Sequence, residues 1–202
     1  MKKKYCIEVL VAITICIAPC LVFADYQAGK DAFDRMDYPA AFKEFKALAD
    51  QNDASGQYGL GVMYDMGEGV PHNSKEAARW YGLAAEQGNA DAQNNLGAMY
   101  EAGEGISEDS KQAVKWYRKA AEGHNFDAPN NLGAMYLTGI GVPRDYVRAY
   151  MWFDLAIRRG DRAATKNINF VKKKMTPDQI MEAQSLANKW MDIYITRWKR
   201  LR

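Results

Sequence analysis

The sequence predicts an all-α protein built as a stack of antiparallel helix pairs, and an exact internal repeat is the main reason. The stretch Asn94–Tyr100 returns letter for letter as Asn130–Tyr136, and a looser copy, Tyr58–Tyr64, precedes both. The step is 36 residues each time, as from Asn94 to Asn130. Such a period indicates a solenoid, in which like units stack because no unit can bury its apolar face alone.

Each unit carries two helical patterns separated by a Gly-x-Gly turn, as at Gly67 and Gly69. Glycine suits this turn because it adopts backbone angles that other residues avoid. The pattern before a turn is Ala92, Leu96, Gly97 and Tyr100, and the pattern after one is Ala77, Trp80, Tyr81 and Ala84. Spacings of three and four residues place each set on one face of a helix. We therefore expect a helix hairpin in each unit, with small residues where its helices pack.

Capping residues mark the expected helix starts. Asn73-x-x-Glu76 and Asp109-x-x-Gln112 predict capping boxes, and Asp145 holds the same place in the third unit. Thr176, followed by Pro177 and then by Gln179, predicts the start of a last helix.

Glycines mark the expected ends of the second helices, at Gly88 and Gly160. In the middle unit His124 stands at that place and Gly123 precedes it, so we expect the helix to stop one residue earlier. Pro129 fits only the first turn of a helix, which predicts that the next helix begins late, near Asp127.

The pattern Ala-x-x-x-Leu-Gly-x-x-Tyr, then Gly-x-Gly, then Ala-x-x-Trp-Tyr-x-x-Ala-Ala resembles the Sel-1-like repeat family, a branch of the tetratricopeptide-type repeats. The resemblance covers about residues 53–160. It implies a right-handed superhelical solenoid of antiparallel helix pairs with a C-terminal capping helix. It also implies a role in protein–protein interaction and assembly.

The repeat pattern divides the chain into six segments. We expect a signal peptide (1–24), a tetratricopeptide-like N-terminal cap (25–52), three Sel-1-like repeats (53–88, 89–124 and 125–160) and a basic C-terminal helical cap (161–202). The last segment begins like a fourth first helix, because Ala164 and Ile168 keep their places, and then loses the pattern. A stripe from Ile180 to Trp198 predicts a final helix that docks back on the end of the stack.

The N-terminus predicts export from a bacterial cell. Lys2–Lys4 precede an apolar run from Ile7 to Phe23, and Val22-Phe23-Ala24 offers a cleavage site. An uncleaved membrane anchor and a lipid on Cys20 are the alternatives. Cys6, Cys16 and Cys20 are the three cysteines of the chain, so a chain cut after Ala24 has no disulfide and no thiol site.

Charge is divided unevenly along the chain. Residues 25–157 hold 12 basic and 20 acidic residues, and residues 158–202 hold 12 basic and 4 acidic ones. This asymmetry can steer a charged partner, or it can belong to solvated surfaces. The tail Arg197–Arg202 interleaves basic and aromatic residues, so it either contacts an anionic envelope surface or forms a frayed, solvated helix end. The acidic repeats make nucleic acid a poor partner.

The sequence lacks the residue patterns of an enzyme. His72 and His124 are the two histidines and form no zinc-binding spacing, the serines form no nucleophile motif, and no glycine-rich phosphate loop occurs. We therefore expect no catalysis, no metal and no cofactor.

The resemblance places partner contacts on the first helix of each unit, which lines the concave groove in tetratricopeptide-type stacks. Asn94 and Asn130 hold a place where related folds use asparagine to bind a peptide backbone; the alternative is that copied asparagines face water. The candidate groove residues are Tyr58, Asp65, Asp91, Asn94, Glu101, Asp127, Asn130 and Leu137, with Ser55, Val62, Ala98 and Ala134 beside them.

The resulting hypothesis is an exported, monomeric module that binds a protein or peptide segment in its groove as an adaptor, regulator or assembly factor. One alternative is an envelope hydrolase, which needs a close pair of acidic residues acting on cell-wall material. The other is a structural stabiliser of an envelope complex, tethered by an uncleaved N-terminus.

Overall fold

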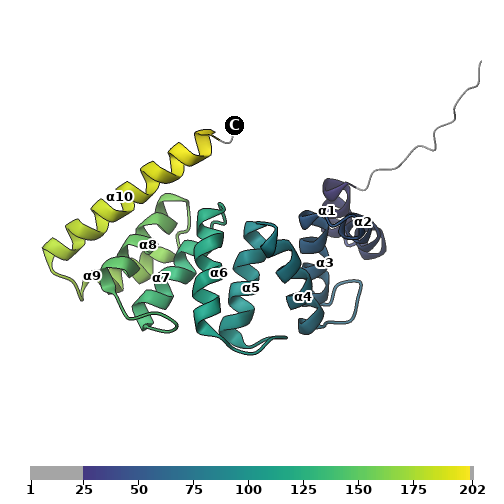
Figure 1. Ribbon diagram of the computed structural model, residues 1–202, viewed down its shortest axis with the longest axis horizontal. Helices are drawn as coiled ribbons and strands as arrows, with labels where there is room; N and C mark the ends of the chain where they lie inside the picture. The colour runs from purple at the N-terminus through teal and green to yellow at the C-terminus, as the bar shows by residue number, and fades with distance from the viewer. Residues whose placement is uncertain (1–24, 201–202) are drawn as a thin grey trace, which may run out of the picture.

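The computed structural model describes residues 25–200 of the chain, with side chains as far as residue 196. Over this range the chain is entirely helical, with ten helices and no strand (Figure 1). The expected signal peptide and the tail residues 197–202 fall outside the described side chains. The helices are α1 (Tyr26–Asp34), α2 (Tyr38–Asp50), α3 (Ala54–Met66), α4 (Ser74–Glu86), α5 (Ala90–Ala102), α6 (Ser110–Glu122), α7 (Ala128–Thr138), α8 (Tyr146–Arg158), α9 (Ala164–Lys172) and α10 (Pro177–Arg200).

The helices stack in chain order as a solenoid of helix pairs, as the period predicts (Figure 1). Each helix packs against the next one along the chain from α1 to α9, and α10 returns to pack on α8. Successive first helices also touch one another: α1 contacts α3, α3 contacts α5, and α7 contacts α9. The first helices therefore share one face of the stack, which we call the first-helix face.

A glycine of the first helix fits against an aromatic ring of the second helix in every full repeat. A β-carbon at these glycines would overlap the ring, because real β-carbons essentially never approach a neighbour within 3.0 Å. It would lie 2.5 Å from Tyr81 at Gly61, 2.8 Å from Tyr117 at Gly97, and 2.7 Å from Phe153 at Gly133. The glycine thus allows the two helices to approach closely while the ring fills the space between them.

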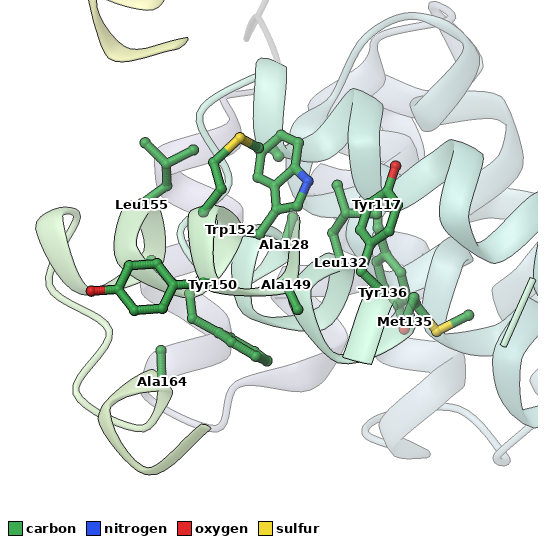
Figure 2. Close-up of a cluster of buried hydrophobic side chains, with 14 of the residues drawn as sticks. Tyr117, Ala128, Leu132, Met135, Tyr136, Ala149, Tyr150, Trp152, Leu155 and Ala164 are labelled. Carbon is green, nitrogen blue, oxygen red and sulfur yellow. The ribbon is translucent and has the colours of Figure 1, made fainter. Parts of the chain in front are cut away.

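Buried apolar residues join the repeats into one continuous stack. Trp80 packs with residues of α1, α2 and α3, and Trp116 is buried among residues of α4 and α5, so each indole contacts the preceding helix pair. Toward the C-terminus the core runs through α6, α7, α8 and α9, where Tyr117, Leu132 and Trp152 pack together (Figure 2). Each repeat therefore buries its apolar face against a neighbour.

The expected capping boxes form only in part within the repeats. The Asn73 side chain accepts a hydrogen bond from the Glu76 N–H (3.1 Å), and Asp109 and Asp145 cap α6 and α8 in the same way. The N–H of each capping residue instead donates to the carbonyl of the repeated tyrosine, as from Asn73 to Tyr64 (2.9 Å). This bond closes the turn of the hairpin. A complete box forms at α10, where the Gln179 N–H donates to Thr176 and the Thr176 N–H donates to Gln179.

The prediction that α6 stops one residue early is wrong. Gly123 has φ −89° and is the C-cap of α6, as Gln87 is of α4. His124 then adopts the left-handed conformation, with φ +78°, at the place of Gly88 and Gly160. The helix keeps the length of its counterparts, and His124 bears the backbone strain that glycine avoids.

The late start of α7 is confirmed. Its first residue is Ala128, two places after the position of Ala54 and Ala90 in α3 and α5. Asn125 caps the altered start: its side chain accepts hydrogen bonds from the Asp127 and Ala128 N–H groups (3.0 and 2.8 Å). This buried side chain accepts hydrogen bonds from N–H groups that the first turn of a helix otherwise leaves without a partner.

The final helix docks on the last full repeat, as its stripe predicts. Ala183 and Ala187 are fully buried, and Trp190 meets Trp152 edge to face with ring centroids 5.6 Å apart. Arg159 joins the two parts: its guanidinium donates to the Ala121 carbonyl (3.0 Å) and stacks on the rings of Trp190 and Tyr194. Burial lowers the pKa of Arg159. These cation–π contacts hold α10 across the second helices.

Met36 offers a test of backbone strain in the short turn between α1 and α2. It adopts φ +63° and is 74% exposed, so its side chain contributes little packing. We predict that Met36→Gly raises the free energy of unfolding by about 1 kcal/mol, because glycine adopts this conformation without the clash of a β-carbon. Urea unfolding measures the change. Met36→Ala is the control, because it keeps the β-carbon; equal stabilisation by alanine would show that strain is not the cause.

Candidate functional site

The first-helix face carries four rows of residues that repeat at the 36-residue step. One residue of each row lies on α3, one on α5 and one on α7 or its cap. The rows are Ser55, Asp91 and Asp127; Tyr58, Asn94 and Asn130; Val62, Ala98 and Ala134; and Asp65, Glu101 and Leu137. Their exposure varies, since Asp91, Ala98, Glu101 and Asp127 are exposed while Asn94 is 9% exposed.

An aromatic pocket opens between α1 and α3 at the N-terminal end of this face. It has a volume of about 200 Å³. Tyr58 and Val62, which the sequence places on this face, form one wall. The opposite wall comes from α1, whose residues sequence reasoning did not assign to the site. The lining residues are Tyr26, Lys30, Phe33, Asp34, Phe45, Tyr58, Gly59 and Val62.

The tyrosines of this pocket are neutral hydrogen-bonding groups at physiological pH. Burial, and to a smaller extent the negative charge of Asp91, raises the pKa of Tyr58 to about 12. The same two causes raise the pKa of Tyr26. Asp91 therefore lies within electrostatic reach of both rings. The pocket combines apolar walls with this carboxylate and with the ion pair of Lys30 and Asp34 at its edge.

Asp65 on α3 and Glu101 on α5 are bonded within their own repeats. The Tyr81 hydroxyl donates to Asp65 (3.1 Å), and the Tyr117 hydroxyl donates to Glu101 (2.7 Å). Burial is the main cause of the raised pKa of each tyrosine. The third repeat has Leu137 and Phe153 at the same positions, so the carboxylate and the hydroxyl are lost together.

The hydrolase alternative would depend on the carboxylates of this face, and the structure gives their partners. Asp65 and Glu101 each bind a tyrosine of their own hairpin, and no hydrogen bond joins them among the described residues. Over the same part of the chain, no group of three or more His, Cys, Asp or Glu side chains could hold a metal ion.

The repeated asparagines connect neighbouring first helices. The Asn131 amide donates to the Asn94 side-chain oxygen (3.0 Å), and the Asn167 amide donates to the Asn130 side-chain oxygen (3.0 Å). The alternative that these asparagines simply face water does not hold for Asn94, which is buried and whose side-chain oxygen accepts a bond. Their binding to a peptide backbone stays a prediction. Asn131 and Asn167 also recur at the 36-residue step, and this recurrence is the sequence signal that could have predicted the two hydrogen bonds between first helices.

Asp91 and Asp127 complete the placement of the candidate residues. Asp91 accepts a hydrogen bond from the Asn125 side chain (2.7 Å), which ties α5 to the start of α7. Asp127 is the exposed N-cap residue of α7, and its side chain makes no capping bond. The structure therefore brings the eight candidates onto one face but uses several of them to hold the stack.

A second cleft, of about 590 Å³, lies among α6, α7, α8 and α10. Arg118 donates to the Tyr136 hydroxyl here (2.8 Å), and Arg148 pairs with Asp145. Glu182 adds a second carboxylate, so two cations and two anions line the cleft. The side chains that line this cleft therefore carry no net charge.

Among the helices of residues 25–200, none is both long and apolar enough to cross a bilayer.

A family model of the Sel1 repeat matches residues 54–89, 90–125 and 127–161, more than half of the chain. Its repeats lie one or two residues after the boundaries inferred from the sequence.

Two solved structures are similar over most of the chain. A Sel1 repeat protein from Oxalobacter formigenes is 38% identical with a TM-score of 0.68, and the match covers 72% of this chain and 60% of that one. The protein c5321, a protective antigen of uropathogenic Escherichia coli strains with an SLR fold, is 30% identical with a TM-score of 0.50. That match covers 88% of this chain and 48% of the other, so this chain spans about half to three fifths of each relative. No curated protein shows significant sequence similarity.

The raised pKa of Tyr58 predicts a pH dependence of stability. The pKa of Tyr58 is about 10 in the unfolded state and about 12 in the folded state. The neutral hydroxyl therefore contributes to the free energy of unfolding, and this contribution is fully present below pH 10. That contribution is lost as pH rises toward 12. We expect Tyr58→Phe to lose less unfolding free energy than the unchanged protein over this range, measured by urea unfolding at several pH values. Tyr146→Phe controls for the loss of one hydroxyl; equal losses in all three proteins would contradict the assignment.

Proposed function

The chain belongs to the Sel1 repeat family, and we propose that it binds a segment of a partner protein on its first-helix face. Sel1 repeats are generally protein–protein interaction modules. The family is also generally non-catalytic, and we propose that this member is no exception. The role that follows is that of an adaptor, regulator or assembly factor.

The aromatic pocket is the observation that carries this proposal. It is a preformed hollow that a single aliphatic or aromatic side chain of a partner can fill. Tyr26 and Tyr58 supply ring surface and hydroxyl groups at one place, which is the combination that protein interfaces favour. Their position beside Asp91 adds a contact for a basic residue of the same segment.

The exposed residues next to the pocket extend it into a binding surface. Ala98 is exposed and Ala134 is half-buried, and small side chains there leave room for a partner backbone. Asp91, Glu101 and Asp127 are exposed along the same face. Since the hydrogen bonds to tyrosine and asparagine fix several of these groups, the surface is held in place before a partner arrives, which reduces the entropic cost of binding.

We further propose that the protein acts after export, in the cell envelope or outside the cell. Support comes from the sequence: Lys2–Lys4, the apolar run Ile7–Phe23 and the small-residue site ending at Ala24. Mass spectrometry of the N-terminus distinguishes a chain that starts at Asp25 from a tethered one. A retained N-terminus would support the membrane-tethered alternative.

Replacement of Ala98 tests the binding surface without removing a bond that holds the fold. We predict that Ala98→Arg abolishes crosslinked capture of the partner by the tagged full chain in its own cells, because a long charged side chain then occupies the centre of the face. The readout is the set of captured proteins, identified by mass spectrometry.

Leu83→Arg is the matched control. Leu83 is exposed on α4, which is a second helix, so this variant places the same arginine side chain away from the first-helix face. Both variants are first shown to keep the helical circular dichroism of the unchanged protein. Equal capture by the two variants would place the binding surface elsewhere.

A further inference from the structure

The register of the first-helix face continues into α9. Asn167 donates to Asn130 as Asn131 donates to Asn94, and α9 packs against α7 as a first helix does. Each row of the face therefore gains a fourth member. These members are Ala163, Lys166, Phe170 and Lys173, which follow Asp127, Asn130, Ala134 and Leu137.

The sign of the charge changes along this face. From α3 to the N-cap of α7 it carries Asp65, Asp91, Glu101 and Asp127, and α7 contributes Leu137 in the row of Asp65 and Glu101. On α1, Lys30 and Asp34 neutralise each other in an ion pair beside the pocket. At α9 the same row continues with Lys173, and the row of Tyr58 continues with Lys166. Both lysines are exposed, and none of the ion pairs of the described residues involves either one.

Each end of the face also has an apolar contact. At the acidic end this is the pocket of Tyr26, Tyr58 and Val62. At the basic end it is Phe170, which stands in the row of Val62 and Ala98 and is 53% exposed. The Lys174 amino group lies 5.9 Å from the centroid of that ring. A large exposed aromatic residue between lysines is a contact for a segment that brings both an apolar side chain and a carboxylate.

We propose that the occupant of the first-helix face is a protein segment with segregated charge. Its basic half carries an apolar side chain into the pocket of Tyr26 and Tyr58, near Asp91. Its acidic half lies over α9, where Lys166 and Lys173 meet its carboxylates and Phe170 meets an apolar side chain. This inference rests on the proposed function and adds the chemistry and the placement of the segment.

Charge segregation gives the complex a fixed placement along the solenoid. Reversal of the segment on the face would set basic residues against Lys166 and Lys173 and acidic residues against Asp91, and like charges disfavour that arrangement. The contacts are exposed, so salt weakens them, and the screening length of about 8 Å at physiological ionic strength confines each end to its own half of the segment.

Selection from a random peptide library displayed on phage tests the proposal with the purified protein as bait. We expect enriched peptides to carry Lys or Arg with an apolar residue in one half, and Asp or Glu in the other half. With Lys166→Glu/Lys173→Glu as bait, the acidic half should disappear from the enriched sequences while the basic half remains. One enriched peptide, measured by fluorescence anisotropy, should bind that variant about tenfold more weakly, which is a loss of about 1.4 kcal/mol.

Lys111→Glu/Lys189→Glu is the matched control, since it makes the same charge change on α6 and α10. It should enrich the same peptides as the unchanged protein. Enrichment of peptides without an acidic half, or of the same peptides by the α9 variant, would overturn the inference and leave the proposed function intact. Ala98→Arg as bait tests the proposed function itself. If this variant enriched the same peptides as the unchanged protein, the first-helix face would not be the binding surface, and both proposals would be wrong.

Discussion

The close contact between a first-helix glycine and a second-helix aromatic ring is the constraint on which the rest of the structure depends. The three full repeats show it at Gly61, Gly97 and Gly133, each with a ring where a β-carbon would lie. A glycine inside a helix lowers stability by about 1 kcal/mol relative to alanine. Its presence at all three positions indicates that the close packing against the ring stabilises the hairpin by more than this amount. The contact sets how closely the hairpin closes, and hence how the next first helix lies beside it.

Polar side chains then fix the register between hairpins. The pairs Asn94–Asn131 and Asn130–Asn167 join successive first helices, and Asn125 joins Asp91 to the start of α7. Arg159 performs a related task at the end of the stack, where it reaches two backbone carbonyls and two rings of α10. Such bonds are individually modest, but each leaves a buried group unsatisfied if the repeats slide. These bonds therefore also set the spacing of the exposed side chains on the first-helix face.

The sequence predicts the helix pairs, the caps and the docking of α10 because these follow from local spacing that repeats at every step. It does not reveal the partners across repeats: the asparagines recur visibly, yet their bonds depend on how two hairpins meet. The sequence does not place Tyr26 in the pocket, because α1 does not keep the repeat step and no register sets it near Tyr58. The glycine pattern gives the wrong end for α6, because the repeat places a left-handed residue at His124 although it is not a glycine. Lys166 and Lys173 lie where the repeat pattern is lost, so the pattern alone does not reveal that they continue two rows of the face.

The role of the glycine–aromatic contact is tested most directly by comparing two glycine-to-alanine changes by urea unfolding. Gly82 lies within α4 with nothing within 4 Å of an added β-carbon, whereas a β-carbon at Gly133 would lie 2.7 Å from the Phe153 ring. We predict that Gly82→Ala stabilises the protein by about 1 kcal/mol through helix propensity, and that Gly133→Ala destabilises it by about 1–3 kcal/mol. We also predict that the destabilisation by Gly133→Ala is smaller in a Phe153→Leu background. Equal stabilisation by both alanines would contradict the claim that the glycine–aromatic contact sets the packing of the hairpins.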